Sequence, residues 1–298
     1  MAVINSSYVG RFAPSPTGPL HFGSLIAAAG SYLDARANRG RWLLRIDDID
    51  PPREQPGATD DIRRSLEQFG FEWDGPVLLQ STRSEAYRAA LEQLRERGLM
   101  FYCTCSRKQI AEEGDKVYPG TCRERIEPPA GQEYALRLRV DAGETGLADL
   151  IQGAYAQDLR IEIGDFVLQR RDGLYSYHMA CSVDDAFQGI THVVRGADLL
   201  DSTPRQIHLQ QLLGLPIPHY AHLPVAAGPN GQKLSKQNLA RALDAARREQ
   251  LLWDALQFLG QQPPRDLLSV DLKSIWEWAA KNWSLNKVPK VSMQTYKN

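Results

Sequence analysis

The first fifty residues constrain the fold most, because strand, loop, helix and strand signals follow one another there. The apolar run 8–12 predicts a strand, and prolines 14, 16 and 19 then form a loop that no helix or central strand can cross. Residues 23–39 repeat apolar side chains at helical spacing, and 42–46 predict a second, buried strand. This order predicts an α/β fold of Rossmann type with a parallel, doubly wound sheet.

The rest of the chain divides by pattern into four stretches. Helical spacing continues to about residue 98, and after residue 101 come clustered cysteines and strand patterns at 134–140, 159–163 and 166–169. A buried strand at 192–195 and a helix at 204–213 then return to the α/β pattern, and helices dominate the C-terminal part. We expect these divisions: 1–100, first half of the Rossmann domain; 101–172, an insertion; 173–220, second half; 221–298, a loop and a helical subdomain.

Composition excludes several classes of protein. The 298 residues are 43% hydrophobic and 24% charged, which excludes a disordered chain. The net charge of −1 excludes a protein that coats nucleic acid through a general basic excess, so any RNA contact requires a local patch. Apolar runs such as 25–30 are far shorter than the ~20 residues of a membrane span, and residues 1–10 resemble no export signal. We therefore expect a cytoplasmic protein without a membrane partner.

Two motifs point to nucleotide chemistry. In RFAPSPTGPLHFGS, residues 11–24, a proline loop leads into a helix N-terminus, whose free N–H groups favour phosphate. His21 stands at the helix start, within reach of a phosphate oxygen, and Gly23 leaves space for an adenine ring or ribose. The second motif, KLSKQ at 233–237, follows the glycine-containing segment 228–231. Its two ammonium groups suit the charge that builds on a triphosphate as pyrophosphate leaves.

Three of the four cysteines predict a metal site. Cys103, Cys105 and Cys122 lie within twenty residues, and clustered thiols in a reducing compartment favour metal over disulfides. Zinc takes four ligands, and the insertion contains no histidine. The residues alone leave open whether the cluster binds zinc or is a group of reduced thiols. Cys181 stands apart and predicts a small buried side chain.

Together, and about 210 residues apart, the two motifs resemble those of class I aminoacyl-tRNA synthetases, with 21–24 as the HIGH-type and 233–237 as the KMSKS-type element. Residues 11–20, 45–50 and 194–199 look like the glutamyl/glutaminyl branch. Only 61 residues follow Gln237, too few for the anticodon-binding domains of a glutamyl-tRNA synthetase. The chain therefore most resembles the truncated paralogue family, the glutamyl-queuosine tRNA(Asp) synthetases.

This resemblance implies a ligase that activates L-glutamate with ATP and Mg²⁺. The glutamyl group would pass to the queuosine base at the wobble position of the tRNA(Asp) anticodon. The implied catalytic residues are His21, Lys233 and Lys236, and the implied ATP-binding residues are His21, Gly23, Ser24 and Lys236. The family also implies that Tyr118 joins Cys103, Cys105 and Cys122 around one structural Zn²⁺ in the insertion, and that the C-terminal helices contact the tRNA stem.

The resemblance also implies a glutamate site, which consists of Arg11, Phe12, Ala13, Pro14, Ser15, Asp47, Tyr177 and Arg195. Arg11 and Arg195 suit two carboxylates, and Asp47 suits the α-ammonium group. Two positions depart from the family pattern: Asp47 stands where Glu is more common, and Ser24 replaces the second His of the HIGH element. A surface ion pair of Arg195 with Asp198 or Asp201 is the alternative interpretation.

Three other functions remain as alternatives. A small glutamyl-tRNA synthetase would charge the 3′ end of tRNA(Glu), and a non-catalytic paralogue would only bind RNA. A HIGH-type nucleotidyltransferase would be shorter and would lack the glutamate-binding residues. Nothing in the sequence requires more than a monomer.

Overall fold

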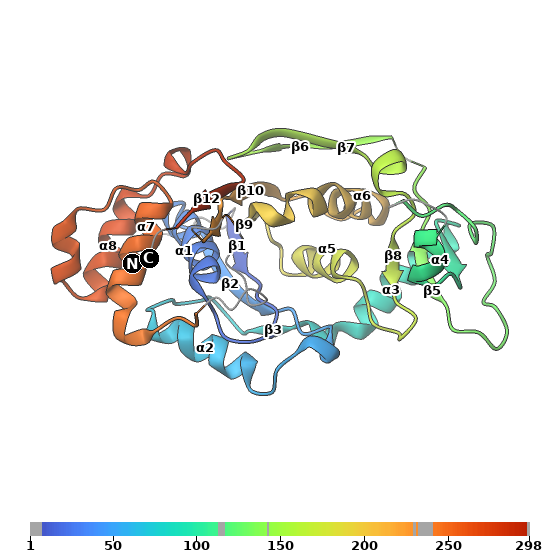
Figure 1. The fold of residues 1–298 in the computed structure, drawn as a ribbon, viewed down its shortest axis with the longest axis horizontal. Coiled ribbons are helices and arrows are strands. Elements are labelled where there is room, and N and C mark those ends of the chain that lie inside the picture. Colours follow the sequence, from blue (N-terminus) through green and yellow to red (C-terminus); the bar gives the residue numbers. More distant parts are fainter. Residues whose placement is uncertain (1–7, 113–116, 142, 229–230, 232–240, 297–298) are drawn as a thin grey trace.

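The computed structural model describes residues 8–112, 117–141, 143–228, 231 and 241–296. Its centre is a set of parallel strands. β1 (Val9–Phe12), β2 (Arg41–Ile46) and β3 (Leu78–Leu79) pair in parallel, as do β9 (His192–Gly196) and β10 (His219–Leu223). The Thr191 N–H donates to the Val9 carbonyl at 2.9 Å, so β9 lies beside β1 (Figure 1). The predicted α/β architecture is confirmed.

Helices cover both sides of these strands. On one side α1 (Phe22–Ala37) packs against β1 and β9, and α7 (Arg248–Phe258) and α8 (Leu272–Asn282) lie beyond it (Figure 1). The other helices are α2 (Ala58–Gln68), α3 (Ser84–Glu96), α5 (Tyr177–Phe187) and α6 (Thr203–Leu213). The ring of Trp42 stacks on Phe71 at 5.5 Å, and Phe71 meets Trp276 edge-on at 4.9 Å, which joins the sheet to α8.

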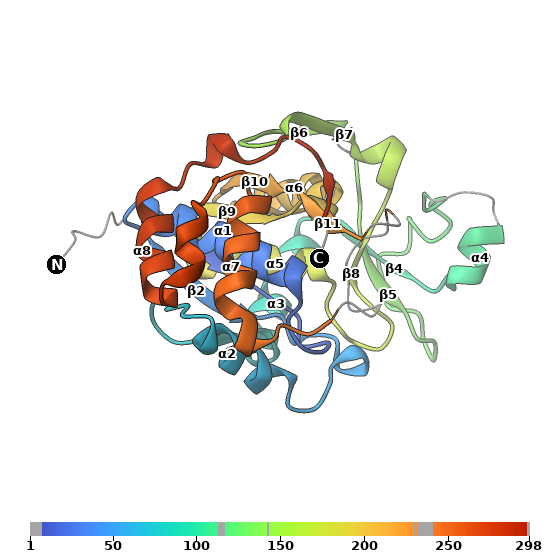
Figure 2. The ribbon, with the colours of Figure 1, turned by 60° about the vertical axis from the view of Figure 1, so that its left-hand side comes forward.

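The segment between the two halves of the sheet contains its own antiparallel sheet. β4 (Met100–Cys103), β5 (Ala135–Leu138) and β8 (Val167–Gln169) form this sheet, with α4 (Arg107–Glu112) beyond it (Figure 2). The boundaries predicted for the insertion, 101 and 172, stay a prediction.

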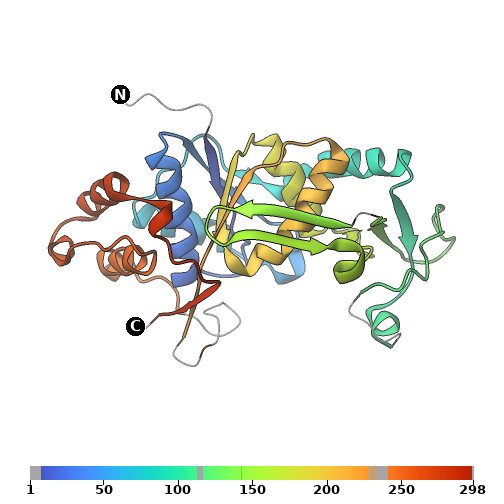
Figure 3. The same ribbon diagram turned by 90° about the horizontal axis from the view of Figure 1, so that it is seen from above.

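A hairpin of β6 (Glu144–Asp149) and β7 (Gly153–Asp158) extends from this segment back over the parallel strands (Figure 3). At its tip the Leu150 N–H donates to the Tyr220 carbonyl at 2.9 Å. The inserted segment therefore contacts the strands that carry the candidate site.

The strand predicted at Leu159–Ile163 is wrong, because these residues form a short π-helix. Their alternating apolar side chains mimic a half-buried strand. The Asp158 carboxylate instead accepts hydrogen bonds from the backbone N–H groups of Arg160 and Ile161, which starts a helical turn. Gly164 ends the turn with a φ of 68°, a conformation that glycine adopts at little cost.

The C-terminal residues return to the N-terminus of α1. β11 (Val225–Ala227) pairs in parallel with β12 (Met293–Thr295), and the Tyr296 ring stacks on Phe22 at 3.8 Å. Among the residues that the structure describes, no helix has the length and apolar character to span a bilayer.

Candidate active site

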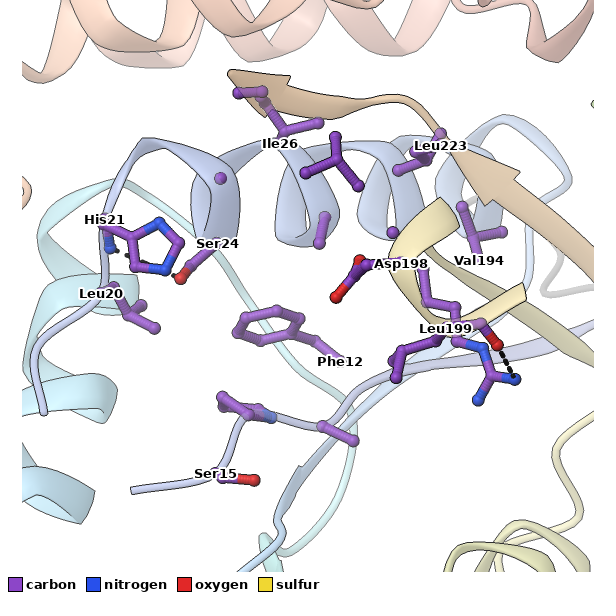
Figure 4. A pocket seen from close by; sticks show the side chains of 18 of the residues that line it. Phe12, Ser15, Leu20, His21, Ser24, Ile26, Val194, Asp198, Leu199 and Leu223 are labelled. Carbon is purple, nitrogen blue, oxygen red and sulfur yellow. Dashed lines mark hydrogen bonds between the residues drawn. The ribbon is translucent and has the colours of Figure 1, made fainter. Parts of the chain in front are cut away.

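A cavity of about 300 Å³ opens at the carboxyl ends of β1, β9 and β10, beside the N-terminus of α1 (Figure 4). Parallel sheets place ligand sites at this edge, where the loops that follow several strands meet. In Figure 4 the Phe12 ring lies between the end of the cavity that holds His21 and Ser24 and the end that holds Leu199.

Most of the predicted site residues line this one cavity. They are Arg11, Phe12, Ala13, Pro14, Ser15, His21, Gly23, Ser24, Tyr177 and Arg195. Asp47 is not among the lining residues. Lys233 and Lys236 lie outside the described residues. The described chain resumes close by, because the Leu243 N–H donates to the Leu20 carbonyl at 2.9 Å.

The start of α1 lies at the cavity. His21 is the extended residue that precedes the helix, and its backbone N–H donates to Ser24 Oγ at 3.4 Å. No acidic side chain occupies the first turn, so the positive dipole end of α1 faces the cavity, whose only lining carboxylate among the described residues is Asp198. Ser24, which the family resemblance implies as an ATP-binding residue, therefore also helps to fix the first turn.

Arg11 is almost completely buried in a network of charges. Its Nε lies 3.2 Å from Asp185 Oδ1, and the same oxygen lies 2.6 Å from Nη1 of Arg45. Arg45 Nε in turn donates to Asp47 Oδ1 at 2.7 Å. Burial alone would raise the pKa of Asp185, but the two guanidinium groups outweigh it and hold that pKa well below its usual range. Two cations and two anions therefore balance beneath the cavity.

The position of Asp47 follows from strand geometry. Side chains two residues apart on an extended chain point to the same side, so Arg45 reaches Asp47 directly. Burial raises the pKa of Asp47 despite this contact. The structure thus brings Asp47 to Arg45 rather than to the wall of the cavity.

Arg195 is equally buried, but its hydrogen-bond partners are neutral: His222 Nε2 at 3.1 Å, Tyr177 Oη at 3.2 Å, Leu199 O at 3.3 Å, Thr203 Oγ1 at 2.8 Å and Gln206 Oε1 at 2.8 Å. No carboxylate of the described residues forms an ion pair with it, so the alternative of a surface pair with Asp198 or Asp201 is wrong. A guanidinium with unneutralised charge on a cavity wall suits an anionic ligand.

Tyr177 begins α5, and its place depends on the preceding residue. Ser176 Oγ accepts the Met179 N–H at 3.3 Å and so fixes the helix start. Burial raises the pKa of Tyr177, so its hydroxyl stays protonated and is a hydrogen-bond donor at neutral pH. Burial likewise lowers the pKa of the adjacent His178 to about 3, which keeps that ring neutral.

The inserted segment brings three cysteine sulfur atoms and one tyrosine oxygen together. The sulfur atoms of Cys103, Cys105 and Cys122 lie within 4.8 Å of one another, with Cys105 and Cys122 3.5 Å apart. Tyr118 Oη lies 3.4 Å from the sulfur of Cys103 and 3.7 Å from that of Cys105. Ligands about 2.3 Å from a tetrahedral zinc ion lie roughly 3.8 Å apart, so this donor set fits zinc.

Four residues that organise the site received no role from the sequence, although Arg45 lies in the motif 45–50: they are Arg45, Asp149, Asp185 and His222. Arg45 and His222 lie within strands, where they resemble ordinary polar positions. Asp185 offered the clearest signal, because an acidic residue in the apolar run of α5 needs a buried partner.

Comparison with known proteins first defines the class. Residues 8–258 match the family described as tRNA synthetases class I (E and Q), catalytic domain. The glutamyl-Q tRNA(Asp) synthetase of Dechloromonas aromatica is 57% identical over 97% of this chain and 98% of its own length. That of Aromatoleum aromaticum is 54% identical over 95% of this chain and 91% of its own length. The chain belongs to the glutamyl-Q tRNA(Asp) synthetase family.

A solved structure shares both the fold and part of the sequence. It is a glutamate tRNA ligase from Elizabethkingia meningosepticum in complex with its amino acid, with a TM-score of 0.80 and 28% identity. The match covers 98% of this chain and 67% of that one. The structure described as a putative arginyl tRNA synthetase from Campylobacter jejuni, at 15% identity and a TM-score of 0.51, shares the fold alone.

Proposed function

We propose that the protein activates L-glutamate with ATP as glutamyl-adenylate and transfers the glutamyl group to the queuosine base at the wobble position of tRNA(Asp). The observation that carries this proposal is the presence of two anion-binding elements in one cavity. Arg195 offers an unneutralised cation for a carboxylate, and the start of α1 offers backbone N–H groups for phosphate.

Activation joins the two anions. A carboxylate oxygen of glutamate attacks the α-phosphorus of ATP, the bond to the β-phosphate oxygen breaks, and pyrophosphate leaves as its Mg²⁺ complex. In this proposal His21, Lys233 and Lys236 stabilise the phosphate charge, while Gly23 and Ser24 lie along the nucleotide. In the second step a hydroxyl of the queuosine cyclopentenediol attacks the glutamyl carbonyl, AMP leaves, and the hydroxyl proton passes to solvent.

Glutamate recognition follows from the charges around the cavity. Arg195 and Tyr177 bind the side-chain carboxylate, while residues 11–15 form the adjoining wall. The predicted contact of Asp47 with the α-ammonium group stays a prediction, because Asp47 does not line the cavity and Arg45 engages its Oδ1. Arg11 divides its charge between the substrate and Asp185, to which it is already bound.

A structural Zn²⁺ is part of the same proposal. Cys103, Cys105, Tyr118 and Cys122 would hold it, and it would stabilise the segment 101–172 without taking part in the reaction. We further propose that the enzyme is a monomer and acts in the cytoplasm, where its tRNA substrate is found. Light scattering of the purified protein measures its molar mass and so tests whether it is a monomer.

The decisive experiment follows labelled glutamate. The protein is incubated with ATP, labelled glutamate and either queuosine-containing or queuosine-free tRNA(Asp), and the label is located after ribonuclease digestion. We expect label only with queuosine present, and only on the anticodon fragment. A parallel incubation contains tRNA(Glu) instead, and label on its 3′ end would identify a small glutamyl-tRNA synthetase. No glutamate-dependent exchange between ATP and pyrophosphate would identify a non-catalytic RNA-binding protein.

The zinc proposal has its own test in metal analysis. Cys105→Ser should lose bound zinc and destabilise the inserted segment, while Tyr118→Phe removes only the proposed oxygen ligand and should weaken zinc binding. Cys181→Ser is the matched control, since this buried thiol lies against Arg45 and Asp185 and away from the cluster. Wild-type protein purified without chelators and found free of zinc would contradict the proposal.

A further inference from the structure

A chain of buried polar groups leads from the inserted hairpin to Arg195. His222, on β10, accepts the Arg195 Nε–H on its Nε2 at 3.1 Å. Its other ring nitrogen, Nδ1, lies 2.6 Å from Oδ2 of Asp149. His222 is 0% exposed and Asp149 is 5% exposed, and neither lines the cavity. This series of hydrogen-bonded groups therefore acts on a ligand only through Arg195.

Asp149 is held in place by its second oxygen. Oδ1 accepts three backbone N–H groups, those of Ile151 at 3.0 Å, Gln152 at 2.8 Å and His222 at 3.1 Å. These bonds fix the turn between β6 and β7 against β10. They also orient the carboxylate so that Oδ2 faces His222. Burial would raise the pKa of Asp149, but the bonds from His222 and the backbone outweigh it and lower that pKa.

Three polar groups contact the His222 ring: Asp149 lies at Nδ1, while Arg195 and the Thr203 hydroxyl, at 3.2 Å, lie at Nε2, where the hydroxyl can donate as well. An ionised carboxylate only accepts hydrogen bonds, so Nδ1 carries the proton. The Arg195 Nε–H only donates, so Nε2 must offer a lone pair. Burial is the largest influence on the ring and lowers the pKa of His222, which agrees with a neutral imidazole. One tautomer satisfies both ends of the chain.

We infer that Asp149 and His222 are positioning residues for glutamate recognition, because they fix the direction in which the Arg195 guanidinium presents its charge. This inference rests on the proposed function. Thr203 and Gln206 hold one Nη atom of the guanidinium, and His222 holds Nε, so the plane of the group is set from two sides. The Asp149 charge stays one imidazole ring away, so it orients the guanidinium without forming an ion pair with it.

Asp149→Asn reverses this arrangement with little change in shape. The amide oxygen replaces Oδ1 in its three backbone bonds, so the amide NH₂ faces His222 Nδ1. That donor favours the other tautomer, whose Nε2–H opposes the Arg195 Nε–H. We expect the KM for glutamate in ATP–pyrophosphate exchange to rise about 10-fold or more, while the KM for ATP stays within about 2-fold.

Asp165→Asn is the matched control within the same inserted segment. Asp165 is also 5% exposed, and it too accepts a backbone N–H on Oδ1, from Val140, and an arginine on Oδ2, from Arg123. It should lose stability while both KM values stay near those of the wild type. At His222, Gln keeps an acceptor near the place of Nε2 and Leu removes it. His222→Gln should therefore retain a lower KM for glutamate than His222→Leu.

Nitrogen-15 NMR of the histidine rings tests the chain without reference to activity. We expect a protonated Nδ1 and an unprotonated Nε2 for His222 in the wild type, and the reverse in Asp149→Asn. A cationic ring or a protonated Nε2 in the wild type would overturn the inference, as would an unchanged KM for glutamate in Asp149→Asn. A wild-type protein with the expected tautomer but no glutamate-dependent exchange would instead overturn the proposed function.

Discussion

Two buried arginines line the same cavity in opposite electrostatic surroundings. Arg11 shares the Asp185 carboxylate with Arg45, and Asp47 completes a balanced group of four charges. Arg195 meets only neutral acceptors among the described residues. The sequence motifs assign both arginines to carboxylate binding. In the structure, however, Asp185 neutralises part of the charge on Arg11, whereas no carboxylate of the described residues neutralises Arg195. A shared residue type on one cavity wall therefore does not imply a shared role.

The difference has an energetic reason. A buried cation is costly unless it is paired, and Asp185 compensates both Arg11 and Arg45 in the folded protein. Arg195 lacks such a partner, so its desolvation is offset by five hydrogen bonds to neutral groups and by the Tyr220 ring, whose centroid lies 5.5 Å from its Cζ. We expect substitutions beneath Arg11 to act mainly on stability and substitutions at Arg195 to act mainly on substrate choice.

The largest expected effect is the loss of Asp185. Asp185→Asn leaves Arg11 and Arg45 with one carboxylate between them, and breaking a buried ion pair costs about 3–5 kcal/mol. Urea denaturation should show this decrease in the free energy of unfolding. Asp61→Asn is the control, because Asp61 pairs with Arg64 on the exposed face of α2 and should contribute at most about 0.5 kcal/mol. Equal losses in the two variants would remove the distinction that we draw for Arg11.

Arg195 gives the next largest effect, on amino-acid choice. Glutamine has no side-chain charge, and aspartate is one methylene shorter than glutamate. The wild-type protein should favour glutamate over both by at least about 10²-fold in kcat/KM, on the scale of ~3 kcal/mol. Arg195→Ala should remove most of this preference, because the remaining wall no longer distinguishes a carboxylate from an amide.

The measurement for Arg195 is ATP–pyrophosphate exchange with each amino acid, and the KM for ATP serves as the internal control. If Arg195→Ala kept full preference for glutamate, another cation would have to recognise the side chain. Arg11 would then be the first candidate, and the contrast between the two arginines would fail.

Local signals explain why part of this architecture was predictable from sequence. The strand, proline loop and helix of residues 8–37 depend on neighbours in the chain, and the structure confirms them. The π-helix at Leu159–Ile163 depends on the Asp158 side chain, which a pattern of apolar residues does not reveal. The Asp149 contact with His222 joins positions 73 residues apart, so only the folded chain brings them together.

Acidification gives the smallest expected effect, a loss of stability. The groups around Arg195 and those around Arg11 should lose their contributions at different pH values. The pKa of His222 is lowered in the folded state. Below about pH 6.5 the His222 ring therefore takes up a proton in the unfolded chain but stays neutral in the folded protein. Stability then falls with decreasing pH, by at most about 1.4 kcal/mol per unit for one proton. The pKa of Asp185 is lowered too, but its unfolded value lies near 3.9, so its contribution is lost only below about pH 4. The surroundings of Arg195 should therefore weaken first.

Urea denaturation of the wild type and His222→Gln at pH 7, 5.5 and 4.5 isolates this contribution. The rings of His178, His192 and His208 also have lowered pKa values, but they are present in both proteins and cancel in the difference. The variant lacks the titrating ring, so its free energy of unfolding should decrease less steeply than that of the wild type between pH 7 and 4.5. The two slopes should differ by at most about 1.4 kcal/mol per pH unit, the value for one proton. Parallel curves would show that His222 titrates alike in the folded and unfolded chain. That result would contradict a ring kept neutral between Asp149 and Arg195, and with it the surroundings that distinguish Arg195 from Arg11.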